Sequence, residues 1–366
     1  MTIANKLGRL ISQALPGRGD GRKRINLALQ GGGAYGAFTW GVLDHLLHDG
    51  RLAFEGISGT SAGAVNAIML ADGLLQAGPD EARKRLAEFW RAASLGGDLP
   101  PLQRAVTDRL FSLLPIEAGP TQVWLDAVSR YFSPYDVNPL NINPLKDLIE
   151  RFVDFERLRK NTELQLFIAA TNVQTGRLRV FSRDEISAET VMASACLPLL
   201  FQAVEIDKVP YWDGGYLGNP VIYPFFRTTR TEDVLVVQIN PLQRRKVPTS
   251  NREIMSRVQE ITFNSSLLAE LRAIEFVSRL IDQGRLPRGT GPGEYRQIRV
   301  HRIVLDGLGE RLSSASRLKT DYKSFDVLHK LGQRAARRFL DSHYEDIGKR
   351  SSIDLQAEVY AERGAA

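Results

Sequence analysis

Near the start of the chain, short apolar runs typical of strands alternate with apolar spacing typical of helices. Short apolar runs at 25–30 and 54–58 each end at a glycine, which is typical of buried strands. Residues 35–48 place apolar side chains three or four positions apart, and 62–71 is rich in alanine, so both predict helices. A further helix is predicted over 80–94. Strands that alternate with helices in this way predict an α/β fold, with a sheet between helical layers.

The later chain continues this pattern and then turns mainly helical. Further strands are predicted at 164–171, 177–181, 204–206, 209–212 and 234–240, the third and fourth of them as a hairpin. Helices are predicted over 144–158, 185–196, 252–281 and 322–344, and a last strand at 300–305 is expected at the edge of the sheet. The pattern therefore predicts an α/β fold with a mainly helical C-terminal part.

One segment breaks the pattern. Residues 96–144 are interrupted by seven prolines and carry several aromatic residues. A proline-broken aromatic insertion between two core elements suits a cap over a binding site. A peripheral helical insertion with no role in binding remains the alternative, and we favour the cap.

The first chemical motif, Gly59-Thr-Ser-Ala-Gly63, lies between a predicted strand and a predicted helix. In such a G-x-S-x-G turn the serine is held at the tip, and Gly59 and Gly63 avoid clashes with the turn. Backbone N–H groups at the start of the next helix, that of Ala62 included, favour a developing negative charge. The motif indicates Ser61 as a nucleophile, although a small-residue turn without chemistry has the same letters.

A second glycine turn follows the first predicted strand. Its glycines Gly31, Gly32 and Gly33 allow the backbone to approach a ligand closely. Together with the N–H group of Ala62, their N–H groups are predicted to surround the oxyanion that forms when Ser61 attacks an ester.

The same turn has a second interpretation. Gly31, Gly33 and Gly36 satisfy the dinucleotide fingerprint G-x-G-x-x-G, and Glu55 falls near the expected acidic position. A dinucleotide-binding protein is therefore an alternative. It is the weaker one, because it gives no role to Ser61.

A nucleophilic serine needs a base. None of the five histidines lies in a glycine-rich loop, and His301 is the least unsuitable of them for a Ser–His–Asp triad. Asp213 is the better candidate, since it sits between an aromatic pair and the glycines Gly214 and Gly215. An ordinary Asp-Gly turn would have the same sequence.

Taken together, the motifs resemble those of the patatin-like phospholipase family, in the same order along the chain. The resemblance covers about residues 25–240. It rests on three motifs, Gly31–Gly36, Gly59–Gly63 and Asp213–Gly215. It implies a three-layer α/β/α hydrolase fold. It also implies a Ser–Asp dyad without histidine, in which Ser61 is the nucleophile and Asp213 its base. Many members carry Arg or Lys where this chain has Tyr35, while the glycines are kept.

The resemblance also implies an activity, the hydrolysis of lipid acyl esters through a Ser61 acyl-enzyme, with a phospholipid or lysophospholipid as the expected substrate. An acyltransferase or a polyester depolymerase would use the same intermediate, so both stay open. No cofactor is implied. We expect a basic tail (1–24), a catalytic domain (25–240) that contains the cap, and a mainly helical extension (241–366) similar to that of some bacterial members. In this extension, the apolar stripe of the helix at 252–281 is expected to pack on the main domain, with a dimer face or an acyl-chain groove as alternatives.

Composition narrows the remaining choices. The single cysteine, Cys196, excludes an intrachain disulfide, and no His, Cys, Asp or Glu cluster has metal-ligand spacing. The net charge of +6 favours anionic surfaces, but no basic helix with interleaved aromatics predicts nucleic-acid binding. Residues 1–24 lack an apolar stretch long enough for a signal peptide. We expect a cytoplasmic protein; peripheral contact with an anionic membrane and a homo-oligomer are left open.

Overall fold

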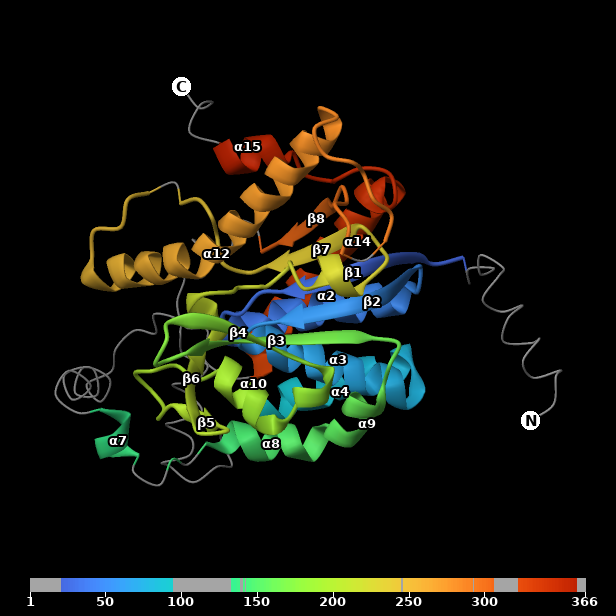
Figure 1. Cartoon of the computed structure of the whole chain (residues 1–366). Helices are drawn as coiled ribbons and strands as arrows, with labels where there is room; N and C mark the ends of the chain where they lie inside the picture. Colours follow the sequence, from blue (N-terminus) through green and yellow to red (C-terminus); the bar gives the residue numbers. More distant parts are fainter. Residues whose placement is uncertain are drawn as a thin grey trace.

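The computed structural model describes residues 21–94, 133–138, 141, 143–244, 246–291, 293–305 and 322–360. Its centre is an eight-stranded sheet with helices on both faces, as Figure 1 shows, and the predicted three-layer α/β/α fold is confirmed. The strands are β1 (Lys23–Leu29), β2 (Leu52–Gly59), β3 (Gln165–Asn172), β4 (Arg177–Ser182), β5 (Val204–Ile206), β6 (Val209–Asp213), β7 (Asp233–Gln238) and β8 (Arg299–Val304).

The sheet is parallel over most of its width and antiparallel at one side. Its strand order is β5-β6-β3-β2-β1-β7-β8, and β4 pairs with β3 off this path. Strands β3, β2, β1, β7 and β8 run parallel to one another. Strands β4 and β6 are antiparallel to β3, and β5 is antiparallel to β6. The strand predicted at 300–305 is β8, and it lies at the expected edge.

The larger hydrophobic core lies under one face of the sheet. The helices on this side include α2 (Gly36–Asp49), α3 (Ala62–Ala77), α4 (Pro79–Ser94), α10 (Ala188–Ser194) and α14 (Tyr322–His343). Apolar strand residues such as Leu27 and Ile57 pack there against Phe38 of α2. Helix α14 packs against α2 where Gly41 and Gly332 face the partner helix, and a Cβ atom on either glycine would clash with backbone atoms of that helix.

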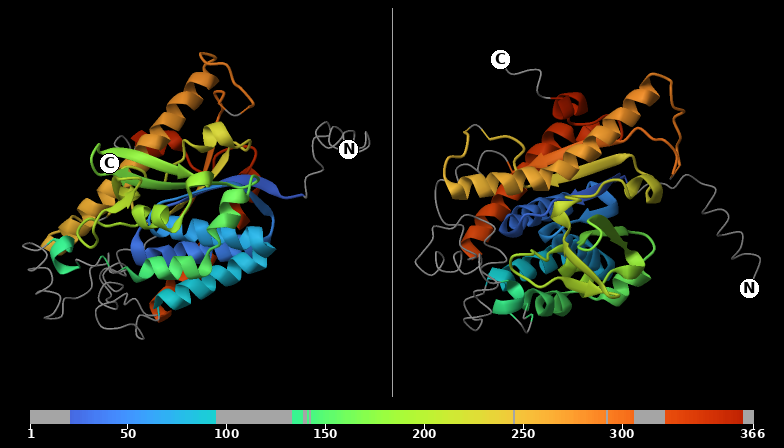
Figure 2. Two further views of the ribbon diagram at one scale, coloured as in Figure 1. Left: turned by 60° about the horizontal axis from the view of Figure 1, so that its bottom comes forward. Right: turned by 60° about the vertical axis from the view of Figure 1, so that its left-hand side comes forward.

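A single long helix, α12 (Asn251–Asp282), covers much of the other face, as Figure 2 shows. It packs with the short helix α11 (Phe225–Thr228) over Ala28 of β1 and Val236 of β7. The apolar stripe predicted for this helix faces the sheet, with Phe263, Leu267, Leu271 and Ile274 buried. The stripe therefore packs on the main domain, as expected.

Two predictions need comment. The helix predicted over 144–158 is two helices, α8 (Pro144–Phe152) and α9 (Phe155–Lys160), because the Asp154 side chain accepts the Arg157 N–H and starts a new helix. Most of the predicted cap lies outside the described residues; α7 (Pro134–Val137) is its described helix. The boundary at residue 240 stays a prediction.

Candidate active site

Ser61 lies at the sharp turn between β2 and α3. Its φ of 55° and ψ of −123° fall outside the common regions for a residue with a side chain, which is typical of a nucleophile elbow. A Cβ atom on Gly59 would clash with the backbone of Gly63, and one on Gly63 would clash with the backbone at the end of β1. The predicted reason for both glycines is therefore visible in the packing. The Ser61 N–H donates to Ser194 Oγ at 2.9 Å.

The sheet register brings Asp213 to the same place. Strand β4 occupies one edge of β3, so β2 and β6 must share the other edge. There Gly59 of β2 pairs with Ile168 and Asp213 of β6 pairs with Ala170, two positions further along β3. Strand β6 therefore ends beside the end of β2, about 7 Å along the strand direction. Strands β2 and β6 therefore point toward each other along the same edge of β3.

The carboxyl group of Asp213 is buried and only half satisfied. Its Oδ1 accepts the Gly215 N–H at 2.7 Å. Among the described residues, Oδ2 has no hydrogen-bond partner of normal geometry. Burial raises the pKa of this carboxyl to about 7, while the Gly215 N–H and the nearby Ser61 hydroxyl lower it. Close to neutral pH, this carboxyl can therefore both accept and return a proton.

The glycine turn packs directly against the elbow. A Cβ atom on Gly31 would lie 2.6 Å from the carbonyl oxygen of Thr60 and 2.7 Å from Ser61 Cβ. The Gly31 N–H itself donates to Asn219 Oδ1 at 2.6 Å. Among the described residues, the buried N–H groups of Gly32, Gly33 and Ala62 have no hydrogen-bond partner. Gly31 thus has a supporting place in the turn, and the other three N–H groups remain available to an oxyanion.

Comparison with known proteins bears directly on this arrangement. A model of the patatin-like phospholipase family matches residues 27–226, more than half of the chain. The chain belongs to the patatin-like phospholipase family. Membership supports lipid acyl hydrolase activity in general. No curated protein matches the chain significantly.

Solved structures of low similarity were also found. VipD from Legionella pneumophila is 15% identical, with a TM-score of 0.41 over 88% of this chain and 67% of that one. The ExoU–SpcU complex of the Pseudomonas aeruginosa type III secretion system gives 20% identity and a TM-score of 0.30, over 67% of this chain and 51% of that one. At these scores the two likenesses add nothing to the family assignment.

Two histidines of this patatin-like chain have partners other than Ser61 and Asp213. His301 Nε2 is 2.9 Å from Asp233 Oδ1, and His301 lies on β8, three strands away from β2 in the sheet. His329 stacks on Trp40 at the interface of α2 and α14. His301, the candidate for a Ser–His–Asp triad, is thus held by a different aspartate.

Glu55, the acidic residue of the dinucleotide alternative, and the single cysteine are also engaged in the fold. The Glu55 carboxylate accepts the N–H groups of Arg230 and Thr231, so it is engaged in the fold rather than open to a ribose. Cys196 is buried, its thiol donates to the Gln202 carbonyl, and burial raises its pKa to about 12. Neither residue has the exposure or the open hydrogen-bonding capacity that a ligand or a nucleophile needs.

Residues outside the three family motifs also hold the site, and sequence reasoning missed them. Ser194 binds the Ser61 N–H, and the Cys196 carbonyl accepts the Asp213 N–H at 2.8 Å. One short segment at the end of α10 therefore contacts both Ser61 and Asp213. The small residues around it, Ala193 and Ala195, are the available signal in the sequence, and such residues ordinarily indicate only close helix packing.

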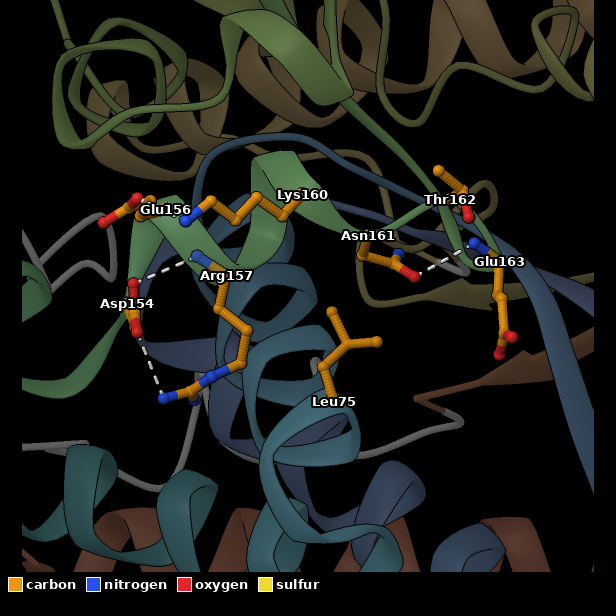
Figure 3. Close-up of a pocket in the computed structure, with 8 residues that line it drawn as sticks. All are labelled: Leu75, Asp154, Glu156, Arg157, Lys160, Asn161, Thr162 and Glu163. Carbon is orange, nitrogen blue, oxygen red and sulfur yellow. Dashed lines mark hydrogen bonds and ion pairs between the residues drawn. The ribbon is translucent and has the colours of Figure 1, made fainter. Parts of the chain in front are cut away.

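The polar hollow in Figure 3 is a separate feature. It has a volume of about 540 Å³ and is lined by Leu75 near the end of α3 and by residues of and around α9. Leu75 lies roughly 20 Å along α3 from the elbow, at 1.5 Å per residue. Arg157 in its lining is paired with Asp72 and Asp154, and Lys160 with Glu156. We assign this hollow no role in the chemistry of Ser61.

The described residues contain no group of three or more His, Cys, Asp and Glu placed to hold a metal ion. Among the same residues, none of the helices is both long and apolar enough to span a bilayer.

Proposed function

We propose that this chain hydrolyses lipid acyl esters, as a phospholipase or lysophospholipase, with Ser61 as nucleophile and Asp213 as general base. One observation carries the proposal. Ser61, on its strained elbow, lies close to a buried carboxyl whose Oδ1 accepts the Gly215 N–H and whose Oδ2 has no hydrogen-bond partner of normal geometry among the described residues. A buried polar atom without a partner is uncommon in folded proteins and calls for an explanation, of which a catalytic role is one.

In acylation, Ser61 Oγ attacks the carbonyl carbon of the ester, and its proton moves to Asp213 Oδ2. The carbonyl oxygen becomes negative and is stabilised by the N–H groups of Gly32, Gly33 and Ala62, at roughly 3–4 kcal/mol for each donor. When the tetrahedral intermediate collapses, the bond to the alcohol oxygen breaks. The Asp213 proton then passes to that oxygen, and the alcohol leaves.

In deacylation, water attacks the Ser61 ester while Asp213 takes a proton from it. Collapse of the second tetrahedral intermediate releases the fatty acid, and the proton on Asp213 returns to Ser61 Oγ. The same carboxyl thus works as a base and then as an acid in each half-reaction. A pKa near the working pH suits both roles.

The substrate we propose is a long-chain, water-insoluble ester. Each acyl methylene that the site removes from water contributes roughly 0.8 kcal/mol to the free energy of binding. Longer acyl chains should therefore be preferred until the acyl-binding site is full. The net charge of +6 favours approach to anionic lipid surfaces, an attraction that salt weakens. An acyltransferase would differ only in using an alcohol instead of water in the second step.

The test is a panel of p-nitrophenyl esters of increasing acyl length, followed by phospholipid and lysophospholipid vesicles, with wild type and Ser61→Ala. We expect turnover to rise beyond short acyls, to fall with added salt on anionic vesicles, and to vanish in the variant. Labelling by a fluorophosphonate should be lost in parallel. A maximum at acetate would refute the long-chain substrate, and labelling that persists in Ser61→Ala would refute the nucleophile.

A further inference from the structure

The carbonyl oxygen of Gly31 is held by two side-chain amides. Asn240 Nδ2 donates to it at 2.7 Å, and Asn219 Nδ2 donates at 3.3 Å. Asn219 also accepts the Gly31 N–H through its Oδ1. The side-chain amide of Asn219 therefore pairs with both polar groups of Gly31, and Asn240 adds a second donor to the carbonyl.

These two asparagines control a neighbouring group as well. The Gly31 carbonyl and the Gly32 N–H belong to one planar trans peptide, so they point in opposite directions. Donors fixed on the carbonyl side therefore turn the Gly32 N–H away from both asparagines. A rotated peptide would remove the Gly32 N–H from the oxyanion position and present a carbonyl oxygen there, which would repel negative charge.

Both asparagines are themselves anchored. Gln30 Oε1 accepts the Asn240 N–H at 2.8 Å, and Gln30 Nε2 donates to the Asn219 carbonyl at 3.3 Å. Helix α12 supports the set from the outer layer, because Asn264 bonds to Gln30 and to the Asn240 carbonyl, and Ser266 Oγ accepts the Asn219 N–H. The amide set thus joins the glycine turn to a helix that lies beyond the residues matched by the family model.

We propose that Asn240 and Asn219 are positioning residues of the oxyanion hole, which aim the Gly32 N–H at the reacting oxygen by fixing the Gly31 carbonyl. The inference rests on the proposed function. Neither side chain is assigned contact with the substrate, so both act through the Gly31–Gly32 peptide. Their loss should weaken stabilisation of the transition state more than binding of the ground state.

The experiment compares an ester with its thionoester, in which sulfur replaces the carbonyl oxygen. A thiolate-like anion is larger and accepts hydrogen bonds poorly, so an intact oxyanion hole favours the oxygen substrate. For Asn240→Ala we expect kcat on the oxygen ester to fall roughly tenfold to a hundredfold, with KM within about threefold, since one oxyanion donor is displaced. The preference for oxygen over sulfur should fall with it.

Asn26→Ala is the matched control. Asn26 is a buried asparagine in the middle of β1, five residues before Gly31, and its side chain donates to Thr229 Oγ1. Its loss removes a comparable buried amide, so stability should fall while the oxygen-to-sulfur preference stays at the wild-type value. Asn240→Ser keeps a shorter donor and serves as a milder second variant, expected to lie between wild type and Asn240→Ala.

An active wild type whose Asn240→Ala and Asn240→Ser variants keep the full oxygen preference would overturn this inference alone. Equal losses on both esters would do the same, because they would indicate general damage. A wild type that cleaves neither ester and is not labelled by a fluorophosphonate would instead overturn the proposed function, and the inference with it.

Discussion

Two buried aspartates in the same sheet have opposite surroundings. Asp233 begins β7, and its carboxylate is bound by Arg299, by His301 and by the Gly348 N–H. Although burial raises its pKa, these partners lower the pKa of Asp233 to about 2. Asp213 ends β6 with a single N–H on Oδ1 and a pKa raised to about 7.

The difference lies in how completely each carboxylate is satisfied. A fully bonded carboxylate stays charged and holds the fold together, whereas a half-bonded one is ready to accept a proton. Burial alone therefore does not identify a catalytic group. Asp213 differs from Asp233 in having fewer hydrogen-bond partners on its carboxyl group and a serine nearby. The following experiments test this difference.

The largest effect is expected for Ser61→Ala, because this change removes the hydroxyl group whose proton Asp213 Oδ2 is proposed to accept. Turnover should fall by roughly a millionfold, as for loss of a serine nucleophile elsewhere. The measurement is steady-state hydrolysis of the best ester, with circular dichroism to confirm folding. Substantial residual turnover would mean that another residue attacks the ester.

Asp213→Asn should reduce kcat by roughly a thousandfold to ten-thousandfold, because the amide keeps the bond to Gly215 but cannot take the Ser61 proton. Single-turnover kinetics on an activated ester would measure the acylation step directly. Unchanged acylation in this variant would remove Asp213 from the mechanism.

Asp233→Asn should show the reverse. Turnover per folded molecule stays near the wild-type value, while the free energy of unfolding falls by about 3–5 kcal/mol because Arg299 and His301 lose their charged partner. Denaturant titration and ester hydrolysis on the same samples would measure both. If His301→Ala instead proved as inactive as Asp213→Asn, a Ser–His–Asp triad would replace the dyad.

The pH dependence of turnover should follow Asp213. The base is active when ionised, so kcat/KM should rise about tenfold per pH unit below 7 and level off above it. Asp233, already ionised above about pH 2, should contribute nothing to this profile. A rate that is flat between pH 5 and 8 would contradict a base with a raised pKa.

The smallest effect concerns stability. The folded-state pKa of Asp213 is raised, so the folded protein holds this proton between about pH 4 and 7 while the unfolded chain releases it. Its carboxyl therefore costs stability as the pH rises through that window. Asp213→Asn should be more stable than wild type by up to about 4 kcal/mol at pH 8 and equal to it near pH 4. Using the difference between the two proteins cancels Glu270, whose pKa is also raised to about 7.

The sequence predicted the elements of the site better than the forces that hold them. Gly59 and Gly63 indicate a tight turn, because only glycine tolerates the close backbone contacts found there. The order of the strands brings Asp213 beside Ser61, but that order depends on which edge of β3 each strand takes. Local periodicity carries no information about such long-range pairing.

The side-chain amides that hold the glycine turn could not be predicted from the sequence for a related reason. Asn219, Asn240 and Gln30 are separated by long stretches of chain and share no spacing that marks a network. Asn264 and Ser266 lie on a helix whose apolar stripe indicated mainly packing on the main domain, and the stripe does face the sheet. Single polar residues on an otherwise structural helix give no signal until the fold brings them to the glycine turn.

The position of β1 has a consequence for how the protein is made. Asn26 pairs on one side with Gly56 of β2, which follows soon after it, and on the other side with Val234 of β7. At 5–20 residues per second, a ribosome needs roughly 10–40 s to make the roughly 200 residues between these two events. Throughout that interval the β7 side of β1 is an open strand edge, which can pair with other chains. We therefore expect nascent chains stalled before β7 to aggregate or to require a chaperone, even though all three motifs have already been synthesised.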